Sequence, residues 1–413
     1  MRRDVMIGLK AASVASMMTM SAGFALAQPA AEPAKETTKE AAPAEKAALD
    51  LAKPVIKDIP VIRPGKDFTI EAYVSGVEVP WSIVWTSASR MLFTERTGKV
   101  RVVEGDKLSE SPLYTVPDLI GKGGENGLMG LAVHPNYAAN RFVYISYGTK
   151  EDVRVVRLKD IGEALVEPTP IVTGIPAGRN HVGCRLAFGP DGKLYIATGE
   201  TFERELAQDM NSLGGKILRV NDDGTVPSDN PFVSKENTRG EIFSFGHRNP
   251  QGLAWTESGL MLETEHGPSG EVRPARGDDE FNIVQRGADL GWPKVWGSKT
   301  EEGTIAPTMV FSPAIAPASA AYYNAERFPQ WKGSLFFGAL GGLRPNGDPG
   351  VYRIALTGEK VTGIERMATG FGRIRCVAVG PDGAIYFSTS NKDGRAEPRE
   401  GDDKIYRIVP AGT

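Results

Sequence analysis

A short sequence pattern that recurs six times limits the folds open to this chain more than any other feature. Each copy is a turn-forming segment followed by an apolar, β-rich run. The clearest copies are Gly189-Pro190-Asp191-Gly192 before 193–198 and Gly380-Pro381-Asp382-Gly383 before 384–388. Because proline fixes φ and glycine tolerates φ > 0, Pro-Asp-Gly favours a tight turn that leads into a strand.

The spacing of these runs predicts a propeller. Six marker residues, one in each run, lie 51, 51, 66, 75 and 50 residues apart; they are Leu92, Val143, Leu194, Leu260, Leu335 and Ile385. A repeat of about 50 residues with four strands is typical of a propeller blade, and the two long gaps indicate loop insertions. Long amphipathic helical periodicity is nearly absent. We therefore predict an all-β, six-bladed β-propeller whose functional site lies at the mouth of the central channel.

The N-terminal segment is predicted to be a targeting signal that is not part of this fold. Arg2 and Arg3 precede a mildly apolar stretch, and Ala25-Leu26-Ala27 ends it, so residues 1–27 resemble a secretory signal peptide. The paired arginines also fit a twin-arginine signal, and either route predicts a periplasmic protein. A membrane anchor would need a longer and more apolar segment. Residues 28–55 are rich in Ala, Pro, Glu, Lys and Thr, which predicts a disordered tether, and the propeller is expected over 56–413.

Composition and charge exclude several classes of partner. The 413 residues carry 48 Lys and Arg against 51 Asp and Glu, a net charge of −3, so no basic field exists to hold nucleic acid. No apolar run beyond the N-terminus approaches the ~20 residues of a membrane span.

The two cysteines, Cys184 and Cys376, are too few for a disulfide framework. One bridge and two buried small side chains both remain open, and the second is favoured.

Two polar turns are candidates for chemistry. His181 lies among glycines directly before a predicted strand, where a ligand can approach closely, although a structural histidine is the alternative. His247, Arg248 and Asn249 stand together in a Pro/Gly turn. Arginine with asparagine can hold carboxylates or carbonyls, while a turn stabilised by its own side chains is the alternative.

Two further segments could bind ions. Arg373 and Arg375 are two residues apart on a predicted strand, so they repel each other unless an anion or acidic side chains lie nearby. Glu265-His266-Gly267-Pro268, followed by 278–280, gathers hard oxygen ligands of the kind that Ca²⁺ prefers, although acidic loops are often only solvated. G-x-S-x-G, Gly-rich phosphate loops after a strand and H-E-x-x-H are absent from the sequence.

In this order the motifs resemble the PQQ-dependent glucose/sorbosone dehydrogenase family, in particular its soluble aldose sugar dehydrogenases. The resemblance runs from about Pro80 to Ile408 and rests on the segments 80–82, 94–96, 124–130, 185–192 and 214–219. Its most specific pieces are 246–252, 265–268 and 291–293. It implies a six-bladed propeller that holds pyrroloquinoline quinone (PQQ) over its channel. It also implies oxidation of the C1 hydroxyl of aldose sugars to lactones by hydride transfer to the quinone, with electrons passed to an unidentified acceptor.

The resemblance further implies roles for individual residues. His181 matches the general base that takes the proton of the sugar hydroxyl. Arg248 and Asn249 match residues that hold the quinone oxygens and stabilise the charge that develops there, and Arg248 is counted with His181 as catalytic. The backbone carbonyls of Gly267 and Pro268 match ligands of a Ca²⁺ ion that acts as Lewis acid.

The remaining cofactor-binding set mixes matches with departures from the family. Arg373 and Arg375 match binders of the cofactor carboxylates. Glu125 stands where the glucose dehydrogenases have glutamine, and Glu200 where they have aspartate. The family's cofactor-binding lysine near 341–342 is missing, and Arg344 is the expected substitute. About seven extra residues between Pro268 and Asp279 alter the calcium loop.

Two other functions stay open at this stage. One is a non-catalytic propeller that binds a sugar or a protein. The less favoured one is a metal-dependent lactonase, whose chemistry does not need paired arginines or an Arg-Asn turn. Trp292 and Trp296 could stack on a sugar ring, but blade packing is the commoner role for tryptophan in Gly-Trp-Pro.

Overall fold

A computed structural model of the chain describes residues 65, 67–120, 123–269, 277–342 and 349–412. The predicted signal peptide (1–27), the predicted tether (28–55) and Arg344 lie outside the described residues. Helical segments in the described part are short: α1 (Tyr137–Asn140) and the 3₁₀ turns η1 (Arg204–Ala207) and η2 (Pro329–Trp331). No helix among the described residues is long and apolar enough to cross a membrane.

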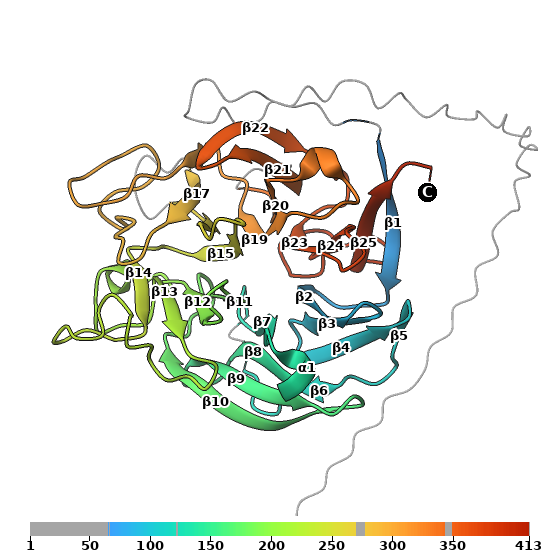
Figure 1. The fold of residues 1–413 in the computed structure, drawn as a ribbon, viewed down its shortest axis with the longest axis horizontal. Coiled ribbons are helices and arrows are strands. Elements are labelled where there is room, and N and C mark those ends of the chain that lie inside the picture. Colours follow the sequence, from blue (N-terminus) through green and yellow to red (C-terminus); the bar gives the residue numbers. More distant parts are fainter. Residues whose placement is uncertain (1–64, 66, 121–122, 270–276, 343–348, 413) are drawn as a thin grey trace, which may run out of the picture. The chain divides into compact units, whose positions relative to one another are not determined.

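The strands form six antiparallel sheets arranged around a ring, which confirms the predicted six-bladed propeller (Figure 1). From the inner to the outer strand, the first three blades are β2 (Pro80–Ser87), β3 (Arg90–Glu95), β4 (Lys99–Glu104) and β5 (Lys107–Leu108), with β6 (Tyr114–Thr115) also paired to β4; β7 (Leu128–Val133), β8 (Phe142–Gly148), β9 (Val153–Asp160) and β10 (Leu165–Ile175); and β11 (Gly183–Phe188), β12 (Leu194–Thr198), β13 (Lys216–Val220) and β14 (Ile242–Phe245).

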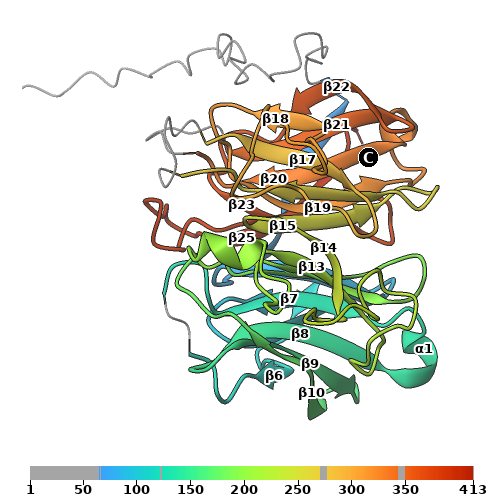
Figure 2. The ribbon, with the colours of Figure 1, turned by 90° about the vertical axis from the view of Figure 1, so that its left-hand side faces the viewer.

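The other three blades follow the same order. They are β15 (Pro250–Trp255), β16 (Met261–Glu265), β17 (Asp279–Val284) and β18 (Met309–Phe311); β19 (Pro317–Tyr323), β20 (Ser334–Ala339), β21 (Gly350–Thr357) and β22 (Lys360–Arg366); and β23 (Ile374–Val379), β24 (Ile385–Thr389), β25 (Lys404–Pro410) and β1 (Phe68–Ser75). Figure 2 shows the blades from the side.

The ring closes by combining both ends of the described chain in one blade. β1 pairs antiparallel with β25, so the first strand in sequence is the outer strand of the last blade. The six inner strands contact one another in succession, and β2 contacts both β7 and β23. Closing the ring in this way leaves only short blade edges exposed to other chains.

The core lies between neighbouring sheets, and the repeated runs supply it. Five marker residues (Leu92, Val143, Leu194, Leu335 and Ile385) lie in the second strand of their blades with no exposed surface, and Leu260 directly precedes the sixth such strand. Cys184 and Cys376 are both free and buried, and they pack in two different apolar clusters. The interpretation of two buried small side chains is therefore confirmed.

Candidate active site

His181 is held by a strained backbone at the entrance to β11. Its φ is +53°, and Thr201 and Phe202, which lie opposite, have φ values of +56° and +68°. The Thr201 N–H donates to the His181 carbonyl oxygen over 3.0 Å. A residue other than glycine in the left-handed region costs about 1 kcal/mol or more, and such strain concentrates at functional sites.

The partners of the His181 ring define its tautomer. Nδ1 lies 2.5 Å from Glu200 Oε1, and Nε2 lies 3.0 Å from a terminal nitrogen of Arg248. An ionised carboxylate only accepts and a guanidinium only donates, so Nδ1 carries the hydrogen and Nε2 carries the lone pair. His181 and Glu200 are 4% and 1% exposed. A buried neutral imidazole oriented by a carboxylate is the arrangement that a general base requires.

Arg248 and Asn249 lie where the polar turn meets β15. The Arg248 guanidinium donates to the His266 carbonyl oxygen and to Ser269 Oγ, both over 3.1 Å. Asn249 Nδ2 donates to a Glu125 carboxylate oxygen over 3.3 Å, and its Oδ1 accepts from the Gly183 N–H over 3.1 Å. The structure thus places Arg248 against the predicted base and Asn249 between Glu125 and the start of β11.

Glu125 joins the base to this turn. Its Oε2 accepts from the His181 backbone N–H over 3.0 Å as well as from Asn249, and its Oε1 lies 3.7 Å from Arg395. Burial opposes ionisation of this carboxyl, but the His266 and His181 rings in their charged forms and the permanently charged guanidiniums of Arg375 and Arg395 lower its pKa to about 2. Glu125 is therefore an ionised residue beside the base.

An arginine cluster formed by Arg96, Arg373, Arg375 and Arg395 lies next to Glu125 and Asp393. Arg373 forms an ion pair with Asp393 over 2.8 Å. An acidic side chain near the two arginines was one of the two alternatives that the sequence left open. Arg375 is 2% exposed, and one of its terminal nitrogens donates to Gln251 Oε1 over 3.2 Å. Its Nε has no hydrogen-bond partner among the described residues.

The strand around these arginines is less regular than predicted. β23 begins at Ile374, and the register shifts between Ile374 and Cys376, so Arg373 and Arg375 are not an alternating pair on a continuous strand. Four guanidiniums near two carboxylates leave a positive surplus. That surplus and the unpartnered Nε of Arg375 fit a ligand with several carboxylates, as PQQ has.

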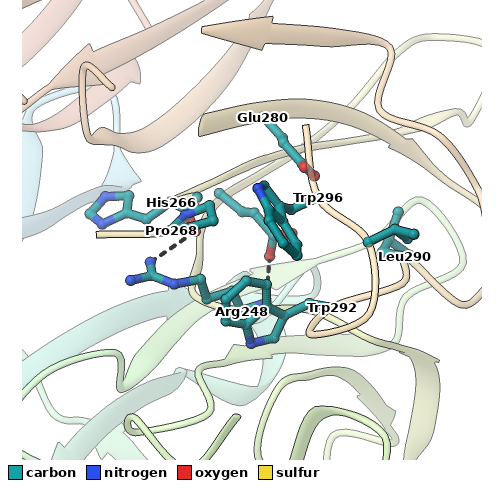
Figure 3. Close-up of a pocket in the computed structure, with 10 residues that line it drawn as sticks. Arg248, His266, Pro268, Glu280, Leu290, Trp292 and Trp296 are labelled. Atoms are coloured by element: carbon teal, nitrogen blue, oxygen red, sulfur yellow. Dashed lines mark hydrogen bonds between the residues drawn. The ribbon is translucent and has the colours of Figure 1, made fainter. Parts of the chain in front are cut away.

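A small cavity lies beside the predicted calcium ligands (Figure 3). It encloses about 10 Å³, room for about one water-sized sphere. Its walls are formed by Arg248, Glu265, His266, Gly267, Pro268, Glu280, Leu290, Trp292, Val295 and Trp296. Two carboxylates and a backbone turn supply hard oxygen atoms there, which fits Ca²⁺.

Asp279 fixes the turn that carries the predicted calcium ligands. Its carboxylate accepts from the Gly267 N–H over 2.8 Å and from the Ile315 and Ala316 N–H groups over 2.7 Å each. Burial raises the pKa of Asp279 to about 6 despite these bonds. Residues 270–276, which hold most of the predicted insertion, lie outside the described residues.

Three residues of this region were not found by sequence reasoning. Arg96 belongs to a segment that carries the family resemblance, but nothing in the sequence gave it a role. Arg395 lies in a polar loop after β24, where arginine is common. The Phe202 ring packs on the His181 imidazole with centroids 3.8 Å apart, although Phe202 is 53% exposed. Trp292, by contrast, is only 3% exposed and packs on Trp296.

Comparison with known proteins identifies the family to which the chain belongs. The family model of the glucose/sorbosone dehydrogenases matches residues 77–405. The aldose sugar dehydrogenase YliI of Escherichia coli is 35% identical over 350 residues, which cover 79% of this chain and 91% of that protein. The PQQ-bound aldose sugar dehydrogenase of Streptomyces coelicolor superposes with a TM-score of 0.72 at 32% identity, covering 84% of this chain and 99% of that one. Quinoprotein glucose dehydrogenase B of Acinetobacter calcoaceticus is 31% identical over 271 residues, 58% of this chain and 55% of that protein.

Proposed function

Because the chain belongs to the glucose/sorbosone dehydrogenase family, we propose that it is a PQQ- and calcium-dependent aldose sugar dehydrogenase that oxidises the C1 hydroxyl to a lactone. The observation that carries the proposal is the His181 ring, held between Glu200 and Arg248 beside an arginine cluster with surplus positive charge. PQQ, when bound, supplies the quinone that accepts the C1 hydrogen as hydride, and Ca²⁺ supplies a Lewis acid.

In this proposal His181 moves the proton. Its Nε2 accepts the proton of the C1 hydroxyl, and the resulting imidazolium is stabilised by Glu200 at Nδ1. Glu200 therefore acts as the residue that positions the base. The sugar hydroxyl must share or replace the contact that Arg248 makes with Nε2, which leaves the guanidinium free to stabilise an oxygen that gains negative charge.

The other residues bind and orient. Arg373 and Arg375 would hold the cofactor carboxylates, with Arg96 and Arg395 adding positive charge around them. Asn249, locked by Glu125 and Gly183, would present its amide to the quinone side of the site. The backbone carbonyls of Gly267 and Pro268 would hold calcium in a turn fixed by Asp279.

We propose that the enzyme works in the periplasm, as its sequence predicts. Residues 1–27 would direct its export to that compartment, where it would oxidise aldoses. A separate electron acceptor would reoxidise the enzyme after each turnover.

The proposal is tested by reconstitution of the purified, cofactor-free protein. We expect dye-linked oxidation of aldoses only when both PQQ and Ca²⁺ are added, across a panel of sugars that differ at C2 and C4. PQQ binding is measured separately by quenching of tryptophan fluorescence. Absence of PQQ binding would overturn the proposal and favour a binding propeller. PQQ binding without turnover on any sugar would overturn the aldose substrate.

A further inference from the structure

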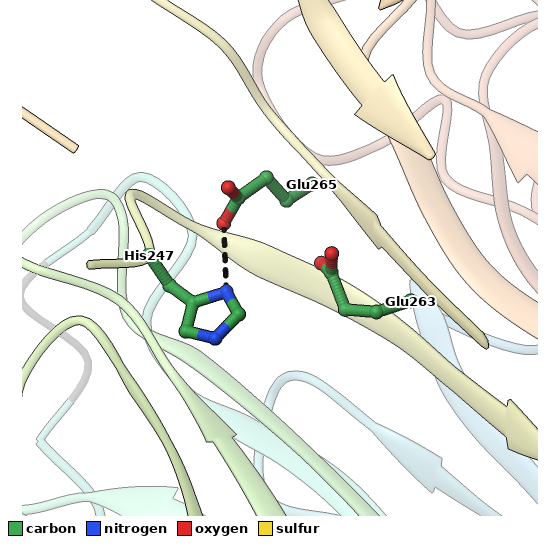
Figure 4. Close-up of side chains that lie close together, drawn as sticks. All are labelled: His247, Glu263 and Glu265. Carbon is green, nitrogen blue, oxygen red and sulfur yellow. Dashed lines mark ion pairs between the residues drawn. The ribbon is translucent and has the colours of Figure 1, made fainter. Parts of the chain in front are cut away.

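His247, Glu263 and Glu265 form a sealed cluster that the proposed reaction does not use (Figure 4). Glu263 and Glu265 are two residues apart on β16, so both side chains lie on the same face of that strand. His247 reaches them from the turn before β15. One potential ligand atom from each residue lies within 4.8 Å of the others, and the three residues are 0%, 0% and 3% exposed.

Several polar atoms of this acidic cluster have no partner. His247 Nε2 contacts Ser244 Oγ over 2.8 Å, but Nδ1 makes no hydrogen bond and faces Glu265 across 3.5 Å. Glu263 Oε1 and Asn282 Oδ1 are buried without a hydrogen-bond partner in the described part of the chain. A buried polar atom without a partner is unfavourable, because it has lost its hydrogen bonds to water and gained none in the protein. Three of them in one small region indicate a missing ligand.

The negative charges of the cluster also indicate a missing ligand. Glu280, which is also buried, shares the Asn282 amide nitrogen with Glu263, at 3.3 Å and 2.9 Å. None of the three glutamates has a lysine or arginine within ion-pair distance among the described residues. Sealed carboxylates without a counter-charge are strongly unfavourable. A cation would satisfy both the charge and the unpartnered atoms.

We propose that His247, Glu263 and Glu265 bind a divalent cation that accepts both an imidazole nitrogen and carboxylate oxygens, as Mn²⁺ does, with Asn282 Oδ1 and Glu280 as further oxygen ligands. A spread of 4.8 Å is about twice a metal–ligand distance, so the atoms fit around one ion. This site neighbours the proposed cofactor calcium, whose protein ligands are the backbone carbonyls of Gly267 and Pro268. Glu265 and Glu280 also line the cavity beside those carbonyls, whereas His247 and Glu263 do not, so Glu263 is the residue that tells the two sites apart. The cation would tie β16 to the turn that carries Arg248.

The test uses the full protein without PQQ, stripped with a chelator. Ca²⁺, Mg²⁺ and Mn²⁺ are each titrated while thermal unfolding and bound metal are measured. We expect one tightly bound ion and a saturable rise in the unfolding temperature with at least one of the three metals. Glu263→Gln keeps the shape but removes a charged ligand, and it should weaken the apparent Kd at least ~10-fold. Glu95→Gln, a change at a buried glutamate in the first blade, is the matched control and should keep the wild-type response.

Two results would overturn the cation site. The first is no metal-dependent stabilisation of the wild-type protein, which would mean that the cluster is neutralised by protons. The second is an unchanged Kd in Glu263→Gln, which would place the bound ion elsewhere, such as at the carbonyls of Gly267 and Pro268. The inference does not depend on the proposed function, because the measurement uses no PQQ and no sugar.

Discussion

The arginine cluster and the acidic cluster carry opposite charge, and they differ in their access to solvent. In the arginine cluster, Arg375 is 2% exposed, but the side chains of Arg373 and Arg395 are 13% and 47% exposed, so the cluster as a whole reaches the solvent. In the acidic cluster, His247, Glu263 and Glu265 are at most 3% exposed and Glu280 is 5% exposed. A charge in an open region can be matched by a large ligand that arrives from solvent. A sealed charge can be matched only by a small ion or by a proton, so the two clusters predict ligands of different size.

Removing the base should give the largest effect and should leave both charged regions intact. His181→Ala deletes the proton acceptor, so we expect turnover to fall about 10²- to 10⁴-fold. PQQ affinity should change only a few-fold, because the arginines remain. Steady-state kinetics and a PQQ titration of the same preparation measure the two quantities. His134→Ala removes a histidine from a turn in another blade and is the control. A turnover within 3-fold of wild type would remove His181 from the mechanism.

The affinity for PQQ tests the inference that the arginine cluster binds a large anionic ligand. Arg375→Met keeps the buried volume but removes charged hydrogen bonds of about 1.5–3 kcal/mol, so PQQ should bind about 10- to 150-fold more weakly. Arg395→Ala, at the exposed rim, should have a smaller effect that disappears at high salt. The Kd for PQQ at two salt concentrations measures both. Equal losses in the two variants would contradict the ranking by burial.

The repeated turns predicted the fold because each blade depends on local signals. Pro-Asp-Gly sets a turn wherever it occurs, and the apolar run after it needs only a neighbouring sheet. Closure of the ring could not be predicted in the same way. β1 pairs with β25 more than 300 positions away, and nothing in the segment 68–75 specifies that partner.

The site was predictable as a set of residue types but not as a set of contacts. His181, Glu200 and Arg248 come from three separate segments, and only the folded ring brings Glu200 Oε1 and Arg248 to opposite ring nitrogens. Glu200 was expected to bind the cofactor, whereas the structure places it against the base. Phe202 was missed because one exposed aromatic residue in a loop has no periodic or motif signal.

Lys216 tests whether a fully buried group without a counter-ion loses its charge, here for a base rather than for the carboxylates of the acidic cluster. It has no exposed surface, and its Nζ donates to the carbonyl oxygens of Leu206, Ala207 and Gly214. Burial lowers its pKa to about 7. Between pH 7 and about 10.5 the unfolded chain therefore binds more protons than the folded one, so stability rises with pH, by up to about 1.4 kcal/mol per pH unit.

Lys216→Met removes this titration while its lost hydrogen bonds add a constant offset. The difference in unfolding free energy between wild type and variant should thus grow in favour of wild type from pH 7 to pH 10. Denaturant unfolding at four pH values measures it. A difference that does not change with pH would mean that a sealed lysine keeps its charge without a counter-ion, which would weaken the argument for the acidic cluster as well.

Phe202 separates the effect of exposure from the effect of charge, because it is an exposed but uncharged residue beside His181. One side of its ring covers His181, while its large exposed fraction leaves area for the apolar face of a sugar. Phe202→Ala keeps a Cβ at the same left-handed backbone position, so the strain is unchanged and only the ring is lost. We expect kcat/KM for the best aldose to fall about 2- to 10-fold, mainly through KM, with PQQ affinity unchanged. Phe202→Tyr should restore it. Because no charge is involved, the loss should be the same at low and high salt, unlike that of Arg395→Ala; a salt-dependent loss would show that Phe202 acts by shielding the neighbouring charges from water.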